Sequence, residues 1–411
     1  MKENTGMNDS FRYVRIHHHV AGEQSPLSRR FGAENAKRVN AFHRSFPEYA
    51  VTPLVSLAAL AEELGVGGIY VKDESYRFGL NAFKVLGGSY AIGCYIAKRL
   101  GKDISEVPYA VMTSSEANEE LKNVTFVTAT DGNHGRGVAW TANRLGRRSV
   151  VYMPQGTAKE RLENILALDS DASIQPMPYD DCVRLARDNA QKYGWVQVQD
   201  TSWPGYEEIP EKIMEGYTTI GHELLQQLGE VKPTHIFLQA GVGSMAGAMA
   251  GFFADVYGPD RPLVTVVEPD SADCLYRTAA ADDGELHFAG EMNSIMAGLC
   301  CGEPCMLAWH VLKECADGFL TIPDAAAAAG MRILGNPLKG DERITSGESG
   351  ASAFGAFTEI MRRSELADLR KELELDEHSR VLFISTEGDT DRANYRRIVW
   401  DGAYTFPIPI A

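Results

Sequence analysis

Lys84 lies at an unusual place for a lysine. Residues 81–97, NAFKVLGGSYAIGCYIA, predict an apolar, glycine-bearing helix with Lys84 in its first turn. A helix dipole favours a lysine at the far end of a helix instead. Because the apolar neighbours Phe83 and Val85 disfavour an ammonium, we expect a free amine that can form a Schiff base. A lysine that only snorkels to the surface is the alternative.

A glycine-rich turn between a strand and a small-residue helix follows at 234–251, THIFLQAGVGSMAGAMAG. Gly241, Gly243 and Gly247 allow close backbone approach, and the free N–H groups of a helix start favour an anion, so a phosphate site is predicted. An NAD-binding dehydrogenase is an alternative, because Glu268 ends the next strand where a ribose-binding acid would stand.

Polar turns recur at 128–139, 346–351 and 384–391. The first of these carries Asp131, Asn133 and His134, whose side chains can contact polar ligand atoms. Turns that follow parallel strands meet at one edge of a sheet. We therefore expect at least the turns at 128–139 and 384–391 to line one crevice.

The elements that must position these turns alternate between strand-like and helix-like segments. Strands are predicted at 69–72, 124–128, 149–153, 173–177, 195–198, 235–239, 263–267 and 381–385, and helices at 158–168, 179–192, 213–228 and 325–329. This alternation is typical of an α/β protein with parallel sheets. Turn residues at 203–205 and the grouping of strands predict a large discontinuous domain, 1–86 and 206–411, and a small domain, 87–205.

The charge and hydropathy of the chain indicate which binding partners and which location to expect. The 411 residues include 40 basic and 56 acidic ones, a net charge of -16, so nucleic acid and anionic membranes are not expected partners. The chain has no run of 18 apolar residues, and its first ten residues are polar, which favours a cytoplasmic protein.

Cysteine and histidine groups invite a metal interpretation, but their spacing does not support it. The seven cysteines include Cys300, Cys301, Cys305 and Cys315, without a C-x2-C pair, so we expect thiols and no metal site. One disulfide is conceivable among Cys274, Cys300, Cys301 and Cys305. Residues 17–19 are adjacent histidines, which favours a strand or loop over a ligand set.

The lysine, the asparagine turn and the phosphate loop together resemble the fold type II, tryptophan synthase β-like, family of pyridoxal-phosphate enzymes. The matching motifs are Phe83-Lys84, DGNHG at 131–135 and GVGSM at 241–245, and the likeness covers nearly the whole chain from about residue 50. It implies an α/β fold of two domains, each with a mostly parallel sheet flanked by helices, with pyridoxal 5'-phosphate in the crevice between them. Homodimers are common in this family.

The resemblance also implies roles for cofactor-binding residues. Lys84 would carry the Schiff base next to Phe83, and Asn133 would contact the ring hydroxyl. The phosphate would be bound by Gly241, Val242, Gly243, Ser244 and Met245. Thr386 would face the pyridine nitrogen, with Ser385 as a close rival, and Glu387 or Asp389 would overturn that assignment by reaching the nitrogen.

One departure from the family points to the substrate. Dehydratases of this fold usually read Ser-Ser-Gly-Asn-His where this chain has Thr130-Asp131-Gly132-Asn133-His134, so a carboxylate replaces a hydroxyl. Together with QDTSWPGYEEIP at 199–210 and SGESGA at 346–351, this implies a carbon–nitrogen lyase that eliminates ammonia from D- and L-2,3-diaminopropionate. The products would be pyruvate and two ammonia molecules.

The residues implied for that reaction are Lys84, Asp131 and Asp200. Lys84 would take the α-proton of the L-substrate and Asp131 that of the D-substrate, while either Asp131 or Asp200 assists the departing amine. Thr130 and the backbone around Asn133 and His134 would hold the substrate carboxylate, and Glu348 lies either near the ring or in the first turn of a helix. The alternatives are a serine/threonine dehydratase of the same fold and a non-catalytic binding protein.

Overall fold

The computed structural model describes residues 11–16, 25–290 and 292–406, and this part of the chain forms two sheets. The larger sheet has seven strands in the order β1-β10-β9-β8-β11-β3-β2, and the smaller has four in the order β6-β5-β4-β7. The strands are β1 (Tyr13–Arg15), β2 (Leu54–Ser56), β3 (Gly68–Asp73), β4 (Thr125–Ala129), β5 (Arg148–Met153), β6 (Asp171–Ile174), β7 (Val196–Gln197), β8 (His235–Gln239), β9 (Leu263–Pro269), β10 (Gly318–Ile322) and β11 (Arg380–Ser385).

Both sheets are mostly parallel. Only the edge strands β1 and β2 pair antiparallel with their neighbours, and the smaller sheet is parallel throughout. The predicted α/β fold class is confirmed.

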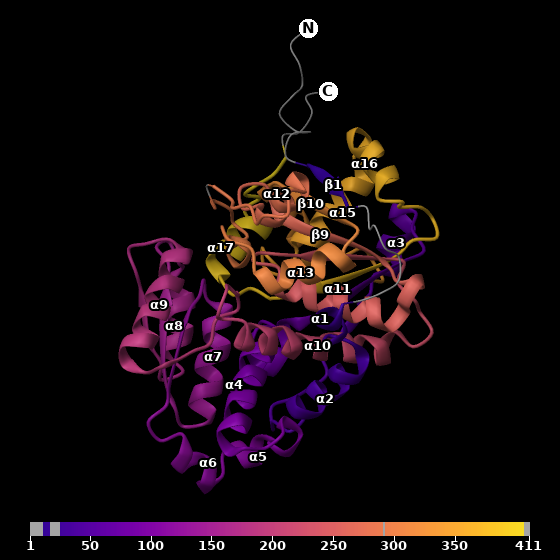
Figure 1. Cartoon of the computed structure of the whole chain (residues 1–411). Helices are drawn as coiled ribbons and strands as arrows, with labels where there is room; N and C mark the ends of the chain where they lie inside the picture. The colour runs from indigo at the N-terminus through magenta and orange to yellow at the C-terminus, as the bar shows by residue number, and fades with distance from the viewer. Residues whose placement is uncertain (1–10, 17–24, 291, 407–411) are drawn as a thin grey trace.

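Helices cover the sheets and connect successive strands (Figure 1). They are α1 (Pro26–Arg29), α2 (Ala33–His43), α3 (Ala58–Leu64), α4 (Val85–Leu100), α5 (Tyr109–Met112), α6 (Ser115–Glu120), α7 (Asn133–Arg144), α8 (Lys159–Leu166), α9 (Tyr179–Tyr193), α10 (Glu208–Leu228), α11 (Ser244–Tyr257), α12 (Cys274–Ala281), α13 (Met306–Cys315), α14 (Asp324–Gly335), α15 (Ser352–Arg362), α16 (Ala367–Glu372) and α17 (Arg392–Val399). Among the helices of the described chain, none combines the length and apolar character needed to cross a bilayer.

The central strands are buried on both faces, as parallel strands between helices must be. In β4 every residue is buried: Phe126 packs into the large core with α4 and α7, and Val127 packs into a second core with α9. In β8, Ile236 and Phe237 likewise enter two different cores. Side chains alternate along a strand, so one apolar run fills both layers.

Most predicted strands are present, and the misses have a physical reason. The prediction 235–239 coincides with β8, whereas 173–177 is wrong at its end because β6 stops at Ile174. Strands β1, β2 and β10 are not predicted from the sequence. Three-residue edge strands such as β1 and β2 carry almost no periodicity, and a short apolar run such as β10 cannot be distinguished from a helix segment.

The smaller sheet is built from four consecutive strands, β4 to β7, which lie inside the middle domain predicted at 87–205. Helix α4, however, packs against α10, which begins after that range. The exact domain limits therefore stay a prediction. The histidines at 17–19 lie outside the described residues.

A buried ion network fixes the strand that leads to Lys84. Glu223 of α10 accepts from Lys72 Nζ of β3 at 2.6 Å and from Arg77 Nη1 at 2.7 Å, and Arg77 also pairs with Glu74 at 2.8 Å. The side chains of all four residues are at most 1% exposed. Burial alone would raise the pKa of Glu223, but Arg77 and Lys72 hold it at about 2, so Glu223 stays ionised and ties α10 to β3.

We expect Glu223→Gln to destabilise the protein by about 3–5 kcal/mol, because it leaves two buried cations without their shared anion. The matched control is Asp171→Asn, which breaks the exposed pair of Arg148 and Asp171 and should cost less than about 1 kcal/mol. Urea denaturation of both variants measures the difference. Equal midpoints for the two variants would show that the network does not hold the helix.

Candidate active site

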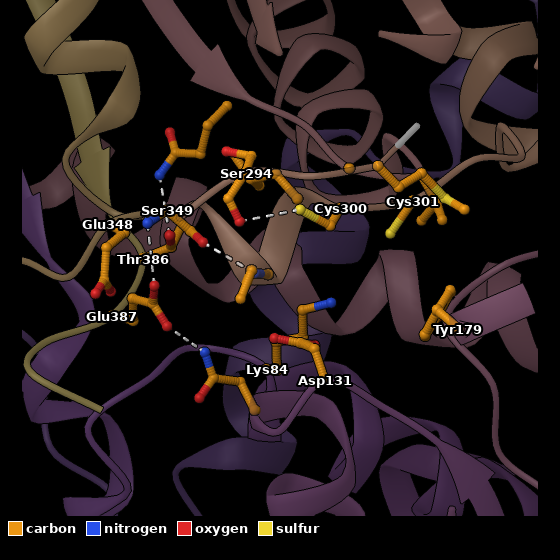
Figure 2. A pocket seen from close by; sticks show the side chains of 18 of the residues that line it. Lys84, Asp131, Tyr179, Ser294, Cys300, Cys301, Glu348, Ser349, Thr386 and Glu387 are labelled. Carbon is orange, nitrogen blue, oxygen red and sulfur yellow. Dashed lines mark hydrogen bonds between the residues drawn. The ribbon is translucent and has the colours of Figure 1, made fainter. Parts of the chain in front are cut away.

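A cavity of about 460 Å³ lies where the carboxyl ends of strands from both sheets meet. Its wall includes residues that follow β4, β5, β7, β8 and β11, namely Asp131, Asn133, 154–158, Asp200, 241–245, Thr386 and Glu387. Figure 2 shows Lys84 and Asp131 on one side of this cavity and Ser294, Cys300 and Ser349 across from them. The turns at 128–139 and 384–391 thus meet at one crevice, as the parallel topology predicts.

Lys84 is paired with a carboxylate inside the cavity. It is the N-cap residue of α4, immediately before the helix that was predicted to include it. Its Nζ donates to Asp200 Oδ2 at 2.5 Å. Burial lowers the pKa of Lys84, but the charge of Asp200, followed by Tyr217 and Asp131, outweighs burial and raises the pKa above its ordinary value.

The expectation that Lys84 is a free amine is therefore wrong for the described state. Its apolar neighbours in sequence do not decide its charge, because Asp200 reaches it from the end of a distant strand. In the structure Lys84 therefore faces an anion and not an apolar pocket.

Asp200 is buried, and both its carboxylate and its main-chain carbonyl accept hydrogen bonds. Its Oδ1 accepts from the Tyr179 hydroxyl at 3.3 Å and from Gln199 Nε2 at 3.2 Å, and its main-chain carbonyl accepts from Ser244 Oγ at 2.7 Å. Burial alone would raise the pKa of Asp200, but His134 and Lys84 hold it below its ordinary value. Asp200 is thus an anion in a fixed orientation, with Oδ2 directed at Lys84.

Thr130 and His134 do not reach the cavity wall, although both were predicted to bind substrate. Thr130 Oγ1 accepts from the Gly132 N–H at 2.9 Å, inside its own turn. His134 Nε2 donates to the Val198 carbonyl at 2.8 Å, and its Nδ1 is buried 3.8 Å from Asp200 Oδ2. Burial lowers the pKa of His134. The hydroxyl of Thr130 and the ring of His134 support the turn and Asp200 from behind the wall.

The glycine turn after β8 forms a cradle of backbone N–H groups. Residues 241–245 all line the cavity, α11 begins at Ser244, and no side chain caps its first N–H groups. Gly243 has φ 98°, a conformation that favours glycine. A Cβ on Gly241 would lie 3.0 Å from Cys301 Sγ and 3.1 Å from Leu299 Cα. The backbone N–H groups of residues 241–245 thus lie at the cavity without side-chain caps, which suits a phosphate.

Thr386 lines the cavity, whereas its rival Ser385 does not. Thr386 Oγ1 accepts from Gln239 Nε2 at 2.9 Å, which leaves its own proton free to donate into the cavity. Ser385 Oγ bonds to Ser346 Oγ at 2.8 Å instead. Gln239 Oε1 is buried and has no hydrogen bond to the described residues, so it also offers an acceptor to a ligand.

The two acids that follow Thr386, Glu387 and Asp389, accept hydrogen bonds from other residues. Glu387 Oε2 accepts from Asn133 Nδ2 at 2.5 Å, and its Oε1 accepts from the Ser349 N–H at 3.1 Å. Asp389 accepts from Asn81 Nδ2 at 3.1 Å and lines a different cavity. Thr386 therefore stays the residue predicted to face the pyridine nitrogen.

Glu348 lies in the cavity wall and not in a helix, since α15 begins only at Ser352. It accepts from Asn394 Nδ2 at 2.5 Å. Burial, followed by the charge of Glu387, raises the pKa of Glu348 to about 7.

Several wall residues were missed by the sequence analysis, among them Tyr179, Arg161 and Gln239. Gln239 ends β8 and Tyr179 follows β6 at the start of α9, so the rule that ligands bind at the carboxyl ends of parallel strands points to both. Arg161 lies in α8 and bonds Asp131 Oδ2 at 3.0 Å, and no local pattern signals it.

The dinucleotide interpretation is not supported. Glu268 is fully buried and accepts from the N–H groups of Leu275 at 2.9 Å and Tyr276 at 2.7 Å, at the start of α12. It therefore caps a helix away from the cavity wall. All seven cysteines are free thiols, and within the described ranges no three His, Cys, Asp or Glu residues are grouped as metal ligands.

We expect Asp200→Asn to make Lys84 more reactive in cofactor-free protein, because the amide removes the anion that holds its ammonium. Acylation by cyanate at mildly alkaline pH, followed by peptide mapping, should modify Lys84 several-fold faster than in the wild type. Glu208→Gln is the matched control, since Lys98 and Glu208 form an exposed pair and Lys98 should react at an unchanged rate. An unchanged rate at Lys84 would refute the pairing.

Comparisons with known proteins agree with this geometry. The chain is 50% identical to the diaminopropionate ammonia-lyase of Salmonella typhimurium over 89% of this chain and 91% of that protein. It is 47% identical to the enzyme of that name from Escherichia coli K12, over 93% of this chain and 95% of the other. The threonine dehydratase IlvA of Escherichia coli is 26% identical, over 82% of this chain and 57% of its own length.

A solved structure is similar over nearly the whole chain. The crystal structure of the Escherichia coli diaminopropionate ammonia lyase, in complex with an aminoacrylate-PLP azomethine reaction intermediate, superposes with a TM-score of 0.89. It is 44% identical and covers 96% of this chain and 98% of that chain.

The residues present also fit pyridoxal phosphate itself. The cavity provides an amine on Lys84, an uncapped helix start for the phosphate, and a hydroxyl on Thr386 suited to a ring nitrogen. The model of the family described as "Pyridoxal-phosphate dependent enzyme" matches residues 46–387. The chain therefore belongs to the family of pyridoxal-phosphate dependent enzymes.

Proposed function

We propose that this protein is a diaminopropionate ammonia-lyase that converts D- and L-2,3-diaminopropionate and water to pyruvate and two ammonia molecules. The observation that carries the proposal is the pair of carboxylates beside Lys84: Asp200 at 2.5 Å and Asp131, which shares the cavity wall. One carboxylate suits proton transfer at Cα and a second suits the β-ammonium, because the α-amino group of the substrate is the one attached to the cofactor. A hydroxy amino acid, the substrate of a serine/threonine dehydratase, would have no use for the second one.

When bound, pyridoxal phosphate acts as an electron sink that acidifies the Cα–H bond of an attached amino acid. Lys84, Phe83 and Asn133 would hold its ring, residues 241–245 its phosphate, and Thr386 its nitrogen. As a neutral hydroxyl held by Gln239, Thr386 would leave that nitrogen unprotonated, which favours elimination over slower competing reactions.

Lys84 is the proposed base for the L-substrate. In the structure its Nζ pairs with Asp200, and the bound cofactor would take up the same nitrogen, so Lys84 can act as a base only once the substrate has replaced it there. A substrate ammonium that enters beside Asp200 competes for the same carboxylate and adds a like charge near Lys84. Both effects lower the pKa of Lys84 and release its lone pair when substrate is present.

Asp131 and Asp200 have separate roles in the proposed reaction. Asp131 lines the cavity and takes the Cα proton of the D-substrate, which points away from Lys84. Asp200, fixed by Tyr179 and Gln199, holds the β-ammonium as it departs, because a protonated amine is the better leaving group. The placement of Thr130 and His134 behind the wall leaves the substrate carboxylate to the backbone N–H groups near Asn133.

We expect Asp131→Asn to lower kcat for the D-substrate by about 10²–10⁴-fold, because a positioned general base contributes that much, and to lower kcat for the L-substrate less than about tenfold. Pyruvate release, followed with both enantiomers, measures the two rates. Equal losses would refute the two-base scheme, and faster pyruvate release from serine than from either enantiomer would favour the dehydratase.

Lys84→Ala should abolish turnover of both enantiomers. The matched control is Lys98→Ala, which removes an exposed lysine of α4 paired with Glu208 and should leave both rates unchanged. A Lys84→Ala protein that still releases pyruvate from diaminopropionate would remove Lys84 from the catalytic role.

For assembly and role we propose a cytoplasmic homodimer that acts in amino-acid catabolism. This proposal draws on the family resemblance. Light scattering of the purified protein should give twice the mass of one chain.

A further inference from the structure

Arg161 is a buried cation that connects Asp131 with the larger sheet. It lies in α8, beside the smaller sheet, and its side chain is 6% exposed. Its Nη1 donates to Asp131 Oδ2 at 3.0 Å, and its Nη2 donates to Thr390 Oγ1 at 3.3 Å. Thr390 follows β11 and donates in turn to Glu387 Oε2 at 3.2 Å. One side chain therefore ties the turns of both sheets at the cavity.

The turn that carries Asp131 is shaped around this arginine. Gly132 has φ 156°, and a Cβ built on it would lie 3.0 Å from Arg161 Cδ. Any side chain at position 132 would push the arginine stem away. The carboxylate at 131, the glycine at 132 and the arginine at 161 thus form one packed unit.

Asp131 needs a cation of its own. The charged groups that face it are Lys84, Arg161, Asp200 and Glu387. Lys84 is already paired with Asp200 at 2.5 Å, and Glu387 is an additional anion. The other titratable groups around Asp131 are His134, Tyr179, Cys300 and Cys301. Burial raises the pKa of Asp131, and Arg161 is the foremost of the groups that oppose it.

Arg161 also determines which carboxylate oxygen of Asp131 can accept a proton. Asp131 Oδ2 is bonded to Arg161, whereas Oδ1 makes no hydrogen bond to the described residues. Asp131 lines the cavity, so one oxygen is anchored and the other is left for a proton.

We propose that Arg161 is a positioning residue that keeps Asp131 ionised and oriented, so that Asp131 can accept the Cα proton of the D-substrate. This inference rests on the proposed function. It assigns to Arg161 a role in the turnover of one enantiomer, which a residue that only supports the fold would not have.

The test compares Arg161→Met and Arg161→Lys with the wild-type holoenzyme, using D- and L-diaminopropionate. Arg161→Met should lower kcat for the D-substrate at least about tenfold more than for the L-substrate, a loss within the range of a general base. Arg161→Lys, which keeps the charge, should restore part of the D-rate. Arg148→Met, which removes an exposed arginine at the start of β5 in the same sheet, is the control and should change neither rate.

The pH profile gives a readout that a structural role would not move. Without Arg161 the pKa of Asp131 rises further, so the acidic limb of kcat/KM for the D-substrate should move to higher pH, while the limb for the L-substrate stays in place. The visible spectrum and affinity of the bound cofactor should not change. Thr390→Val removes the second anchor of Arg161, together with the hydrogen bond from Thr390 to Glu387. It should give a smaller shift in the same direction and serves if Arg161→Met does not fold.

Two results would overturn the inference: equal losses for both enantiomers in Arg161→Met, or an unmoved D-substrate limb in both Arg161→Met and Thr390→Val. Failure of the proposed function looks different, because the wild-type protein would then release pyruvate from neither enantiomer.

Discussion

The ion pair of Lys84 and Asp200 is the interaction on which the site depends. Both side chains are largely withdrawn from water, at 17% and 3% exposure, so each charge stabilises the other. Asp200 can serve as the permanent anion because Tyr179, Gln199 and Ser244 already hold it. Lys84 is the member of the pair that the proposed reaction would use as amine and base.

The fold brings this pair together from distant parts of the chain. Lys84 precedes α4 beside the larger sheet, and Asp200 lies in the turn that follows β7 of the smaller sheet. The buried network around Glu223 holds β3 against α10, and Arg161 joins the turn of Asp131 to the turn after β11. Two parallel sheets whose carboxyl ends face one cavity can thus place groups of opposite charge within hydrogen-bonding distance.

Local chemistry could be predicted from the sequence where it depends on neighbouring residues. The glycine composition of the turn at 241–245 is enough to predict a phosphate site, and these residues line the cavity. Strand β8 coincides with its predicted range because five buried residues are bounded by turn signals. The charge of Lys84 could not be predicted in this way. Phe83 and Val85 suggest a free amine, but the deciding carboxylate stands 116 positions further along the chain. Arg161 was missed for the same reason, since its partners Asp131 and Thr390 meet it only in the folded protein. Thr130 and His134 belong to the right turn, but their side chains point behind the wall, which motif spacing does not reveal.

Lys84 is the amine proposed to bind the cofactor. Borohydride reduction of the holoenzyme, followed by proteolysis and mass spectrometry, tests it most directly, because only an imine becomes a stable bond to its lysine. We predict a pyridoxyl group on the peptide that contains Lys84. Attachment to another lysine such as Lys72 or Lys98, or release of the cofactor without attachment, would contradict it.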